Sequence, residues 1–281
     1  MSTATIKKAR SIERRYGSNY YLATLFLPKT VREAVFVLYA FVRIPDEIVD
    51  NPDPGSNPTA LLEAWKSEWE ETYQTGNGSN DIMLATRELF LTYHIPFSIS
   101  IEFIAAMQLD LHKHRYETYD ELKTYMRGSA EVVGIMLTKI FGCTDETALP
   151  YAEKLGEAMQ FTNFLRDSRD DYVTRKRIYL PQADLHSFGV TEAQLAQAVP
   201  STEYKALMKF EIQRARALFR EAEPGINLLP PYARRAVTLA AKFYEGILDT
   251  IEKNQYAPPL KPVSLSPLQK CKIVISTYVN K

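Results

Sequence analysis

The chain has 281 residues, of which 46% are hydrophobic, and its 34 basic and 34 acidic residues balance to a formal charge of zero. This length fits one large domain or two small ones, and the apolar fraction is enough for a sizeable core. Because the chain lacks the basic excess of nucleic-acid-binding proteins, we expect no nucleic-acid partner.

Both ends of the chain bear on its location. The N-terminal "MSTATIKKARSIERRYG" is basic but lacks the apolar stretch of a signal peptide. The two cysteines, Cys143 and Cys271, have neither metal nor redox spacing. We therefore expect a protein of the reducing cytoplasm. The final "SPLQKCKIVISTYVNK" has the pattern of an amphipathic helix. Docking on the domain is the favoured interpretation, and peripheral association with a membrane surface is the alternative.

Apolar residues recur at helical spacing almost throughout the chain. The pattern predicts helices over residues 31–44, 61–73, 99–114, 151–173, 203–223 and 232–253. Loop signals separate them at 51–58, 76–81 and 94–96, and a Pro-rich connection at 257–262 precedes a C-terminal helix. Strand-like alternation is scarce. We therefore predict a single all-α domain over residues 1–281, with about ten helices.

The first functional candidate is "VRIPDEIVDNP", residues 42–52, which joins prolines to clustered carboxylates. Asp46 and Asp50 are four residues apart, so on a helix they are offset by roughly 40° and share a face. Pro45 either kinks one continuing helix or begins a new one. We favour the continuing helix, because the apolar periodicity before it is unbroken. Pro52 should end the helix near Asp50.

A second acidic stripe lies in "NFLRDSRDD", where Asn163, Asp167 and Asp171 are spaced four apart. Carboxylate and amide oxygens on one face suit a hard cation, Mg²⁺ above all, with Mn²⁺ as an alternative. Such a stripe can also be a solvated helix face. Core-type residues flank both stripes, however, and like charges at this spacing destabilise a helix unless a cation joins them. The two stripes therefore predict a metal site.

Three segments, taken in order, resemble the squalene/phytoene synthases, a family of head-to-head prenyl transferases. They are "GSNYYLATLFLPKTVREAVFVLYAFVRIPDEIVD", "RYETYDELKTYMRGSAEVVGIML" and "GEAMQFTNFLRDSRDDYVTRKRIYLPQADLHSFGV". Together they cover most of residues 17–190. The nearest resemblance is to bacterial and archaeal phytoene synthases. It implies an all-α terpenoid (isoprenoid) synthase fold around a central cavity.

The resemblance also assigns roles to single residues. It implies Asp46 and Asp50 as the first acidic motif and Asn163, Asp167 and Asp171 as the second, both holding Mg²⁺ on diphosphate. Arg43 and Arg177 match positions that contact diphosphate, and Gln160 lies one turn before Asn163. Tyr125 and Tyr179 match aromatic positions of the pocket. The resemblance makes the four aspartates and Tyr125 the catalytic candidates. Two positions depart from the family pattern: Pro45, and Asp170 in place of a glutamate.

The implied reaction condenses two isoprenoid diphosphates through a cyclopropyl diphosphate to a linear product. We expect Thr24 to face the cavity, where a small residue leaves room for C20 geranylgeranyl diphosphate and favours phytoene and carotenoid biosynthesis. The sequence lacks a dinucleotide glycine signature, so we expect no NADPH. One alternative is a related synthase that uses farnesyl diphosphate to make squalene, presqualene diphosphate or dehydrosqualene. A non-catalytic helical binding protein of the same fold is the other.

Overall fold

The computed structural model describes residues 1–257 and 264–279, so the Pro-rich connection at 257–262 lies almost wholly outside the described residues. The described part contains fourteen α-helices, more than the predicted ten because several short helices are separated by single turns. They are α1 (Thr3–Tyr16), α2 (Ser18–Thr24), α3 (Lys29–Asp50), α4 (Pro58–Thr75), α5 (Asp81–Thr92), α6 (Phe97–Asp110), α7 (Tyr119–Met126), α8 (Val132–Ile140), α9 (Leu149–Asp170), α10 (Gln182–Ser187), α11 (Glu192–Leu195), α12 (Thr202–Ile226), α13 (Pro231–Lys253) and α14 (Pro267–Val279).

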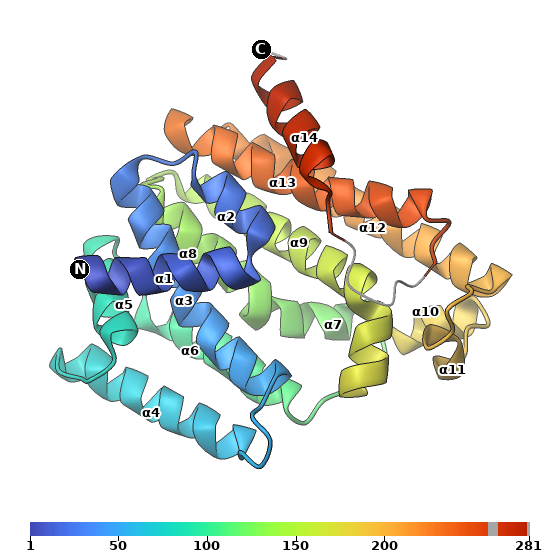
Figure 1. The fold of residues 1–281 in the computed structure, drawn as a ribbon, viewed down its shortest axis with the longest axis horizontal. Coiled ribbons are helices and arrows are strands. Elements are labelled where there is room, and N and C mark those ends of the chain that lie inside the picture. The colour runs from blue at the N-terminus through green and yellow to red at the C-terminus, as the bar shows by residue number, and fades with distance from the viewer. Residues whose placement is uncertain (258–263, 280–281) are drawn as a thin grey trace.

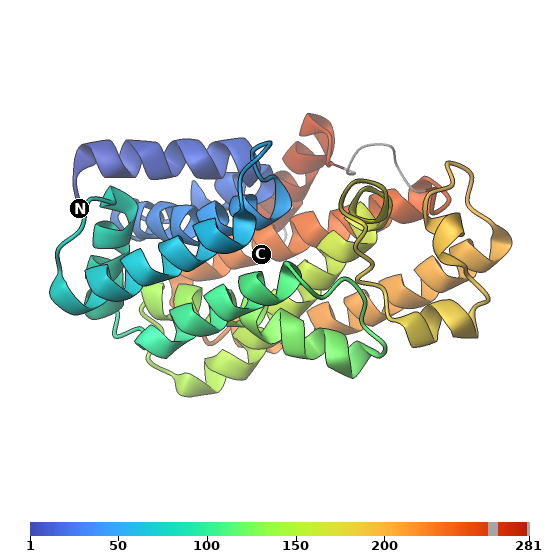
Figure 2. The same cartoon turned by 90° about the horizontal axis from the view of Figure 1, so that it is seen from below.

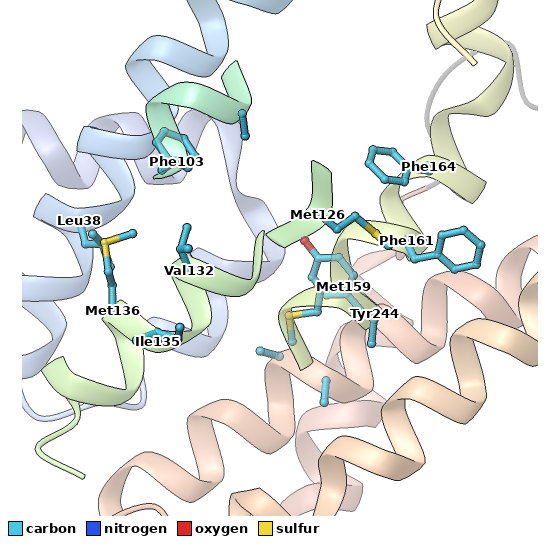
Figure 3. Close-up of a cluster of buried hydrophobic side chains, with 14 of the residues drawn as sticks. Leu38, Phe103, Met126, Val132, Ile135, Met136, Met159, Phe161, Phe164 and Tyr244 are labelled. Atoms are coloured by element: carbon cyan, nitrogen blue, oxygen red, sulfur yellow. The ribbon is translucent and has the colours of Figure 1, made fainter. Parts of the chain in front are cut away.

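The long helix α9 runs through the middle of the molecule and packs on α8, α12 and α13 (Figure 1). Helix α3 packs on α1, α5 and α6 in the other half, and the flattened outline is clear in the second view (Figure 2). Buried side chains from α3, α6, α8 and α9 gather between these halves, among them Leu38, Phe103, Met136 and Phe161 (Figure 3). The all-α prediction is therefore confirmed, and the core lies between the helices that carry the two acidic stripes.

Helix α3 continues through Pro45, as predicted, and ends at Asp50. Pro45 is buried, and the helix stops where the Asn51 N–H bonds to the Glu47 carbonyl and Pro52 follows. A proline nitrogen cannot donate a helical hydrogen bond and its ring crowds the preceding turn, yet α3 stays helical on both sides of Pro45. Asp46 and Asp50 consequently lie on the last turn of one helix, on the face that the spacing predicted.

Two π-helical turns interrupt the helices on either side of the core. One spans Arg127–Glu131 between α7 and α8, and the other spans Asp171–Arg175 directly after α9. Such turns often mark functional sites because they re-aim side chains out of the regular helical register. The second of these π-turns begins at Asp171, so the predicted acidic stripe continues past the end of α9 rather than along it.

Close backbone approach fixes α8 and the first π-turn against α9. A Cβ on Gly134 would lie only 2.4 Å from the Ala152 carbonyl oxygen, and one on Gly156 would lie 2.7 Å from the Ala130 carbonyl oxygen. Any side chain at these two glycines would push the helices apart. The glycines therefore set how closely the wall formed by α8 approaches α9.

The C-terminal helix α14 docks on the body of the protein. Gln269 Nε2 donates to Thr250 Oγ1 of α13 (3.2 Å), and Ile273 packs above Gly246 of the same helix. The predicted docking is thus confirmed for the described residues. No helix in this part of the chain has the length and hydropathy needed to cross a membrane.

Candidate active site

A cavity of about 400 Å³ opens between α3 and α9. Nearly every predicted site residue lies on its wall: Thr24, Arg43, Asp46, Asp50, Tyr125, Gln160, Asn163, Asp167, Asp171 and Tyr179. Much of the remaining wall is apolar, for example Leu38, Phe103 and Val237. Arg177 is the exception among the predicted residues, because it lies behind the wall. The two acidic motifs, far apart in sequence, therefore face one space with a hydrocarbon-like interior.

The first acidic motif is paired with an arginine from its own helix. The Arg43 guanidinium donates to both Asp46 and Glu47, and it lies 4.9 Å from the centre of the Tyr16 ring. Within the cavity the Asp46 side chain keeps 31% of its surface exposed. Burial nevertheless raises the pKa of this carboxyl to about 7, and the negative charge of Asp50 raises it further, against the lowering effect of Arg43. A second positive charge at this position would stabilise the ionised form.

In the second motif, Arg166 donates two hydrogen bonds to Asp167, from Nε to Oδ1 at 2.8 Å and from Nη2 to Oδ2 at 2.5 Å. Asn163 Nδ2 donates to Gln160 Oε1 at 3.3 Å. The other polar atom of this side chain, Oδ1, is buried and has no hydrogen-bond partner among the described residues. Buried amide oxygens are rarely left unpaired. This oxygen is therefore available to a ligand or metal that enters the cavity.

Asp171 begins the π-turn and turns back toward Arg175, whose Nη1 donates to its Oδ1 at 3.2 Å. Burial raises the pKa of Asp171 well above its ordinary value, and the neighbouring charge of Asp167 adds to the rise. Arg175 Nη1 also donates to Asp170 at 2.9 Å, and its Nε donates to the backbone oxygen of Asp50 at 3.4 Å. Arg175 thus touches both motifs.

Arg177 supports the first motif from behind. Its Nη1 donates to Asp50 Oδ1 at 2.5 Å and lies 3.0 Å from Asp110 Oδ2. Tyr179 donates its hydroxyl to the two oxygens of Asp110, each at 2.8 Å. Burial raises the pKa of Asp110 to about 6, although Arg177 opposes the rise. Asp110 therefore links the arginine to the aromatic wall.

The aromatic wall is a stack of four rings beside the acidic end. Phe164 and Tyr179 lie 4.1 Å apart at an interplanar angle of 11°, and Tyr125 stacks on Tyr179 at 5.7 Å and 22°. Tyr116 adds a fourth ring 6.1 Å from Tyr179. Burial raises the pKa of the Tyr125 and Tyr179 hydroxyls well above the ordinary value, so both stay protonated. Aromatic rings of this kind offer electron-rich surfaces to a carbocation.

Sequence reasoning missed two residues of this site. Arg166 and Arg175 hold the second motif in place, but the sequence interpretation singled out only Arg43 and Arg177. A signal was present, because both lie in the run "RDSRDDYVTR" beside or four residues from a motif aspartate. Spacing alone could not show that Arg175 also reaches Asp50.

The donor set of the cavity suits magnesium. Across residues 1–257 and 264–279, no three His, Cys, Asp or Glu side chains converge closely enough to hold a metal by themselves. Magnesium does not need such a cage, since it usually takes one or two carboxylates and completes its shell with water and phosphate. The facing carboxylates and the unpaired Asn163 oxygen supply hard oxygen donors of that kind.

Comparisons with known proteins agree with this geometry. The squalene/phytoene synthase family profile matches residues 13–269. The 15-cis-phytoene synthase of Synechocystis is 36% identical over 259 residues, covering 88% of this chain and 76% of that one. The 15-cis-phytoene synthase of Synechococcus elongatus is 34% identical over 262 residues, covering 89% and 84%.

Solved structures show the same relationship. A dehydrosqualene synthase with bound ligand superposes with a TM-score of 0.91 at 25% identity, covering 99% of this chain and 96% of that one. A squalene synthase from Alicyclobacillus acidocaldarius gives 0.81 at 28% identity, covering 91% and 96%. The predicted family, isoprenoid synthase fold and enzyme class are therefore confirmed: the chain belongs to the squalene/phytoene synthase family and is a prenyltransferase.

Proposed function

We propose that this prenyltransferase is a phytoene synthase of carotenoid biosynthesis, formed by a single domain. It condenses two geranylgeranyl diphosphates head to head, through a cyclopropyl diphosphate, to phytoene. The observation that carries the proposal is one cavity that is lined by both acidic motifs and, over much of the rest of its wall, by apolar side chains. The names of the cyanobacterial relatives support the choice of product.

The acidic end of the cavity binds the diphosphate groups of the substrates. Asp46, Asp50, Asn163, Asp167 and Asp171 would hold Mg²⁺, or Mn²⁺ in its place. When bound, the ion supplies positive charge that stabilises a departing diphosphate. Arg43, which lies on the wall, adds planar donors that match phosphate oxygens, and Gln160 adds an amide. Arg177 acts through Asp50, because its guanidinium is committed to that carboxylate and to Asp110.

The aromatic wall stabilises the carbocation. After the diphosphate leaves, an allylic cation faces the double bond of the second substrate, and a new carbon–carbon bond forms. The stacked rings of Tyr125 and Tyr179 lie beside the acidic end, where they stabilise positive charge and keep water away. Loss of a proton then closes the cyclopropyl diphosphate. Departure of its diphosphate, rearrangement of the resulting cation and loss of a second proton give phytoene. No step consumes a reductant, so the proposal includes no NADPH.

The chain length of the substrate depends on the room that the cavity wall leaves for the prenyl tail. Thr24 lies on the cavity wall and is small, which leaves room for a C20 chain. The structural likeness to a dehydrosqualene synthase favours the main alternative, a synthase for the C15 farnesyl diphosphate. The two differ in the length of tail that the cavity accepts.

We also propose a cytoplasmic enzyme that meets a membrane surface through α14. Leu268 and Ile275 on this helix are 66% and 55% exposed, and Lys272 is exposed on the same helix. An apolar face flanked by lysine suits the interface of an anionic bilayer. A membrane would accept a C40 hydrocarbon product that water does not dissolve.

The test is direct product identification. The protein is incubated with Mg²⁺ and either geranylgeranyl or farnesyl diphosphate, with and without NADPH. We expect phytoene from the C20 substrate, independent of NADPH, and no turnover by Asp46→Ala or Asp167→Ala, both still folded by circular dichroism. Products of C30 only, or full activity in both variants, would overturn the proposal.

A further inference from the structure

Two acidic side chains line the cavity outside both motifs, Glu13 and Asp110. Glu13 is buried in α1 and accepts a hydrogen bond from Thr24 Oγ1 at 2.9 Å. Asp110, the last residue of α6, is also buried, and it contacts both an arginine and a ring of the aromatic wall. A buried carboxylate is costly, so one that stands beside the reaction space calls for a reason.

The contact of Asp110 with the aromatic wall is made through a phenol. The Tyr179 hydroxyl donates to the two oxygens of Asp110, each at 2.8 Å. A hydrogen bond to a carboxylate is about twice as strong as one between neutral groups, so it fixes the position of the ring that donates it. Such a bond also polarises the phenol, and the electron density left on the ring strengthens its attraction for a positive charge.

Arg177 keeps Asp110 in the form that can do this. Its Nη1 lies 3.0 Å from Asp110 Oδ2. Burial raises the pKa of Asp110 to about 6, although Arg177 and the hydrogen bond from Tyr179 oppose the rise. The carboxyl is therefore ionised at pH 8. Burial raises the pKa of the Tyr179 hydroxyl well above its ordinary value, so the proton of the hydrogen bond stays on the phenol.

The same ring borders the part of the cavity where the carbocation forms. Tyr179 lines the cavity together with Asp50 and Asp171, one aspartate from each motif. Asp110 and Arg177 join Tyr179 to Asp50 through successive contacts of 2.8, 3.0 and 2.5 Å. An allylic cation arises at the carbon that carried the diphosphate, next to the aspartates that bind this group. Tyr179 is therefore within the same end of the cavity as the developing charge.

We propose that Asp110 is a positioning residue for the carbocation step, because it holds Tyr179 by its hydroxyl and makes the ring more electron-rich. The inference rests on the proposed prenyl-cation chemistry and deepens it. Since the effect appears only when the ligand carries positive charge, Asp110 stabilises the cation and leaves binding of the neutral chain almost unchanged. The competing explanation is a direct attraction between the Asp110 carboxylate and the cation.

The test measures the binding of a stable cation, which needs no turnover. The ligand is a geranylgeranyl chain that ends in a trimethylammonium group, and its reference is the same chain with an uncharged tert-butyl end. Both are titrated calorimetrically at pH 8 with Mg²⁺ and inorganic diphosphate present. The ratio of the two Kd values measures the preference of the cavity for positive charge, and a general loosening of the cavity cancels in it.

Four variants are compared with the wild type. Asp110→Asn removes the charge of the acceptor, Tyr179→Phe removes the donor but keeps the ring, and the double variant removes both. Tyr119→Phe is the matched control. Tyr119 also donates its hydroxyl to a buried carboxylate, that of Glu157 at 2.7 Å, but neither residue lines the cavity.

We expect Asp110→Asn and Tyr179→Phe each to weaken binding of the ammonium ligand about fivefold, while binding of the tert-butyl ligand stays within about twofold. With the diphosphate substrate, kcat should fall by a similar factor at unchanged KM. The double variant should bind the ammonium ligand as Tyr179→Phe does, because Asp110 has no hydroxyl left to act through. Tyr119→Phe should keep the wild-type Kd ratio.

Two results would overturn the inference. If Asp110→Asn weakens the ammonium ligand further in the Tyr179→Phe background, the carboxylate attracts the cation directly. An unchanged Kd ratio in Tyr179→Phe refutes the role of the hydrogen bond, and this variant decides the question even if Asp110→Asn does not fold. A wild type that gives the expected binding cycle but forms no phytoene refutes the proposed product and leaves the role of Asp110 standing.

Discussion

Arg177 and Asp50 form an ion pair that joins the two halves of the site. Arg177 Nη1 lies 2.5 Å from Asp50 Oδ1, although the residues are 127 positions apart in the chain. The arginine side chain is only 7% exposed, and it also contacts the buried Asp110. Because the buried carboxylate of Asp110 needs a counter-charge, this guanidinium, together with Arg175, holds the end of α3 against the segment that follows the second motif.

Arg177→Met should therefore destabilise the protein and impair catalysis together. Removing one partner of a buried ion pair leaves an uncompensated charge and costs about 3 kcal/mol. Urea unfolding measures the loss of stability, and steady-state kinetics should show a fall in kcat/KM. Arg177→Lys keeps the charge but loses the second donor, so it should lie between the variant and wild type. Wild-type stability in Arg177→Met would refute the bridging role.

Asp46→Asn separates function from folding. The amide oxygen can still accept from Arg43, so the fold should survive, while the loss of negative charge removes a proposed Mg²⁺ ligand. We expect kcat to fall by about 100-fold or more, with a melting temperature close to wild type. Glu47→Gln is the matched control, since Glu47 shares Arg43 but does not line the cavity. Equal losses of kcat in both variants would mean that the disturbed contact with Arg43, and not the loss of a metal ligand at Asp46, lowers the activity.

Some of this site could be read from the sequence and some could not. The spacing of Asp46 and Asp50 predicted their common face because helical geometry is local, and α3 indeed runs through Pro45. The same argument failed to foresee that Asp171 begins a π-turn, which spacing of four does not distinguish from a helix. The contact of Arg175 with Asp50 depends on tertiary packing, and no local pattern encodes it.

Gly134→Ala should destabilise the wall of the cavity. A Cβ there would lie 2.4 Å from the Ala152 carbonyl oxygen, so α8 and α9 would have to separate. Overpacking of this kind costs roughly 1–3 kcal/mol. Thermal unfolding should show a lower melting temperature, and Gly134→Val should lose more. An unchanged melting temperature in both variants would show that the two helices part without cost.

Leu268→Ser/Ile275→Ser should weaken binding to anionic phospholipid vesicles. Both side chains are exposed on α14, and burial of two such residues in a bilayer interface is worth about tenfold or more in affinity. Vesicle sedimentation measures the binding. Leu91→Ser is the control, because Leu91 is 50% exposed on α5, a different helix. If the control weakens binding as much as the double variant, α14 is not the contact.

The stability of the protein should depend on pH through Glu13. Its pKa rises from 4.5 to about 7 on folding, so the folded state binds the proton more tightly than the unfolded state. This contribution to stability is complete below about pH 4.5 and is lost as pH rises through 7.

Glu13→Gln cannot titrate, so relative to wild type it should gain stability between pH 5 and pH 8, by about 2 kcal/mol. Urea unfolding of both proteins at the two pH values measures the change, and subtraction cancels every other titrating group that the variant leaves undisturbed. A constant difference between wild type and Glu13→Gln would mean that Glu13 keeps an ordinary pKa, and that the cavity wall beside Thr24 is wetter than its contacts imply.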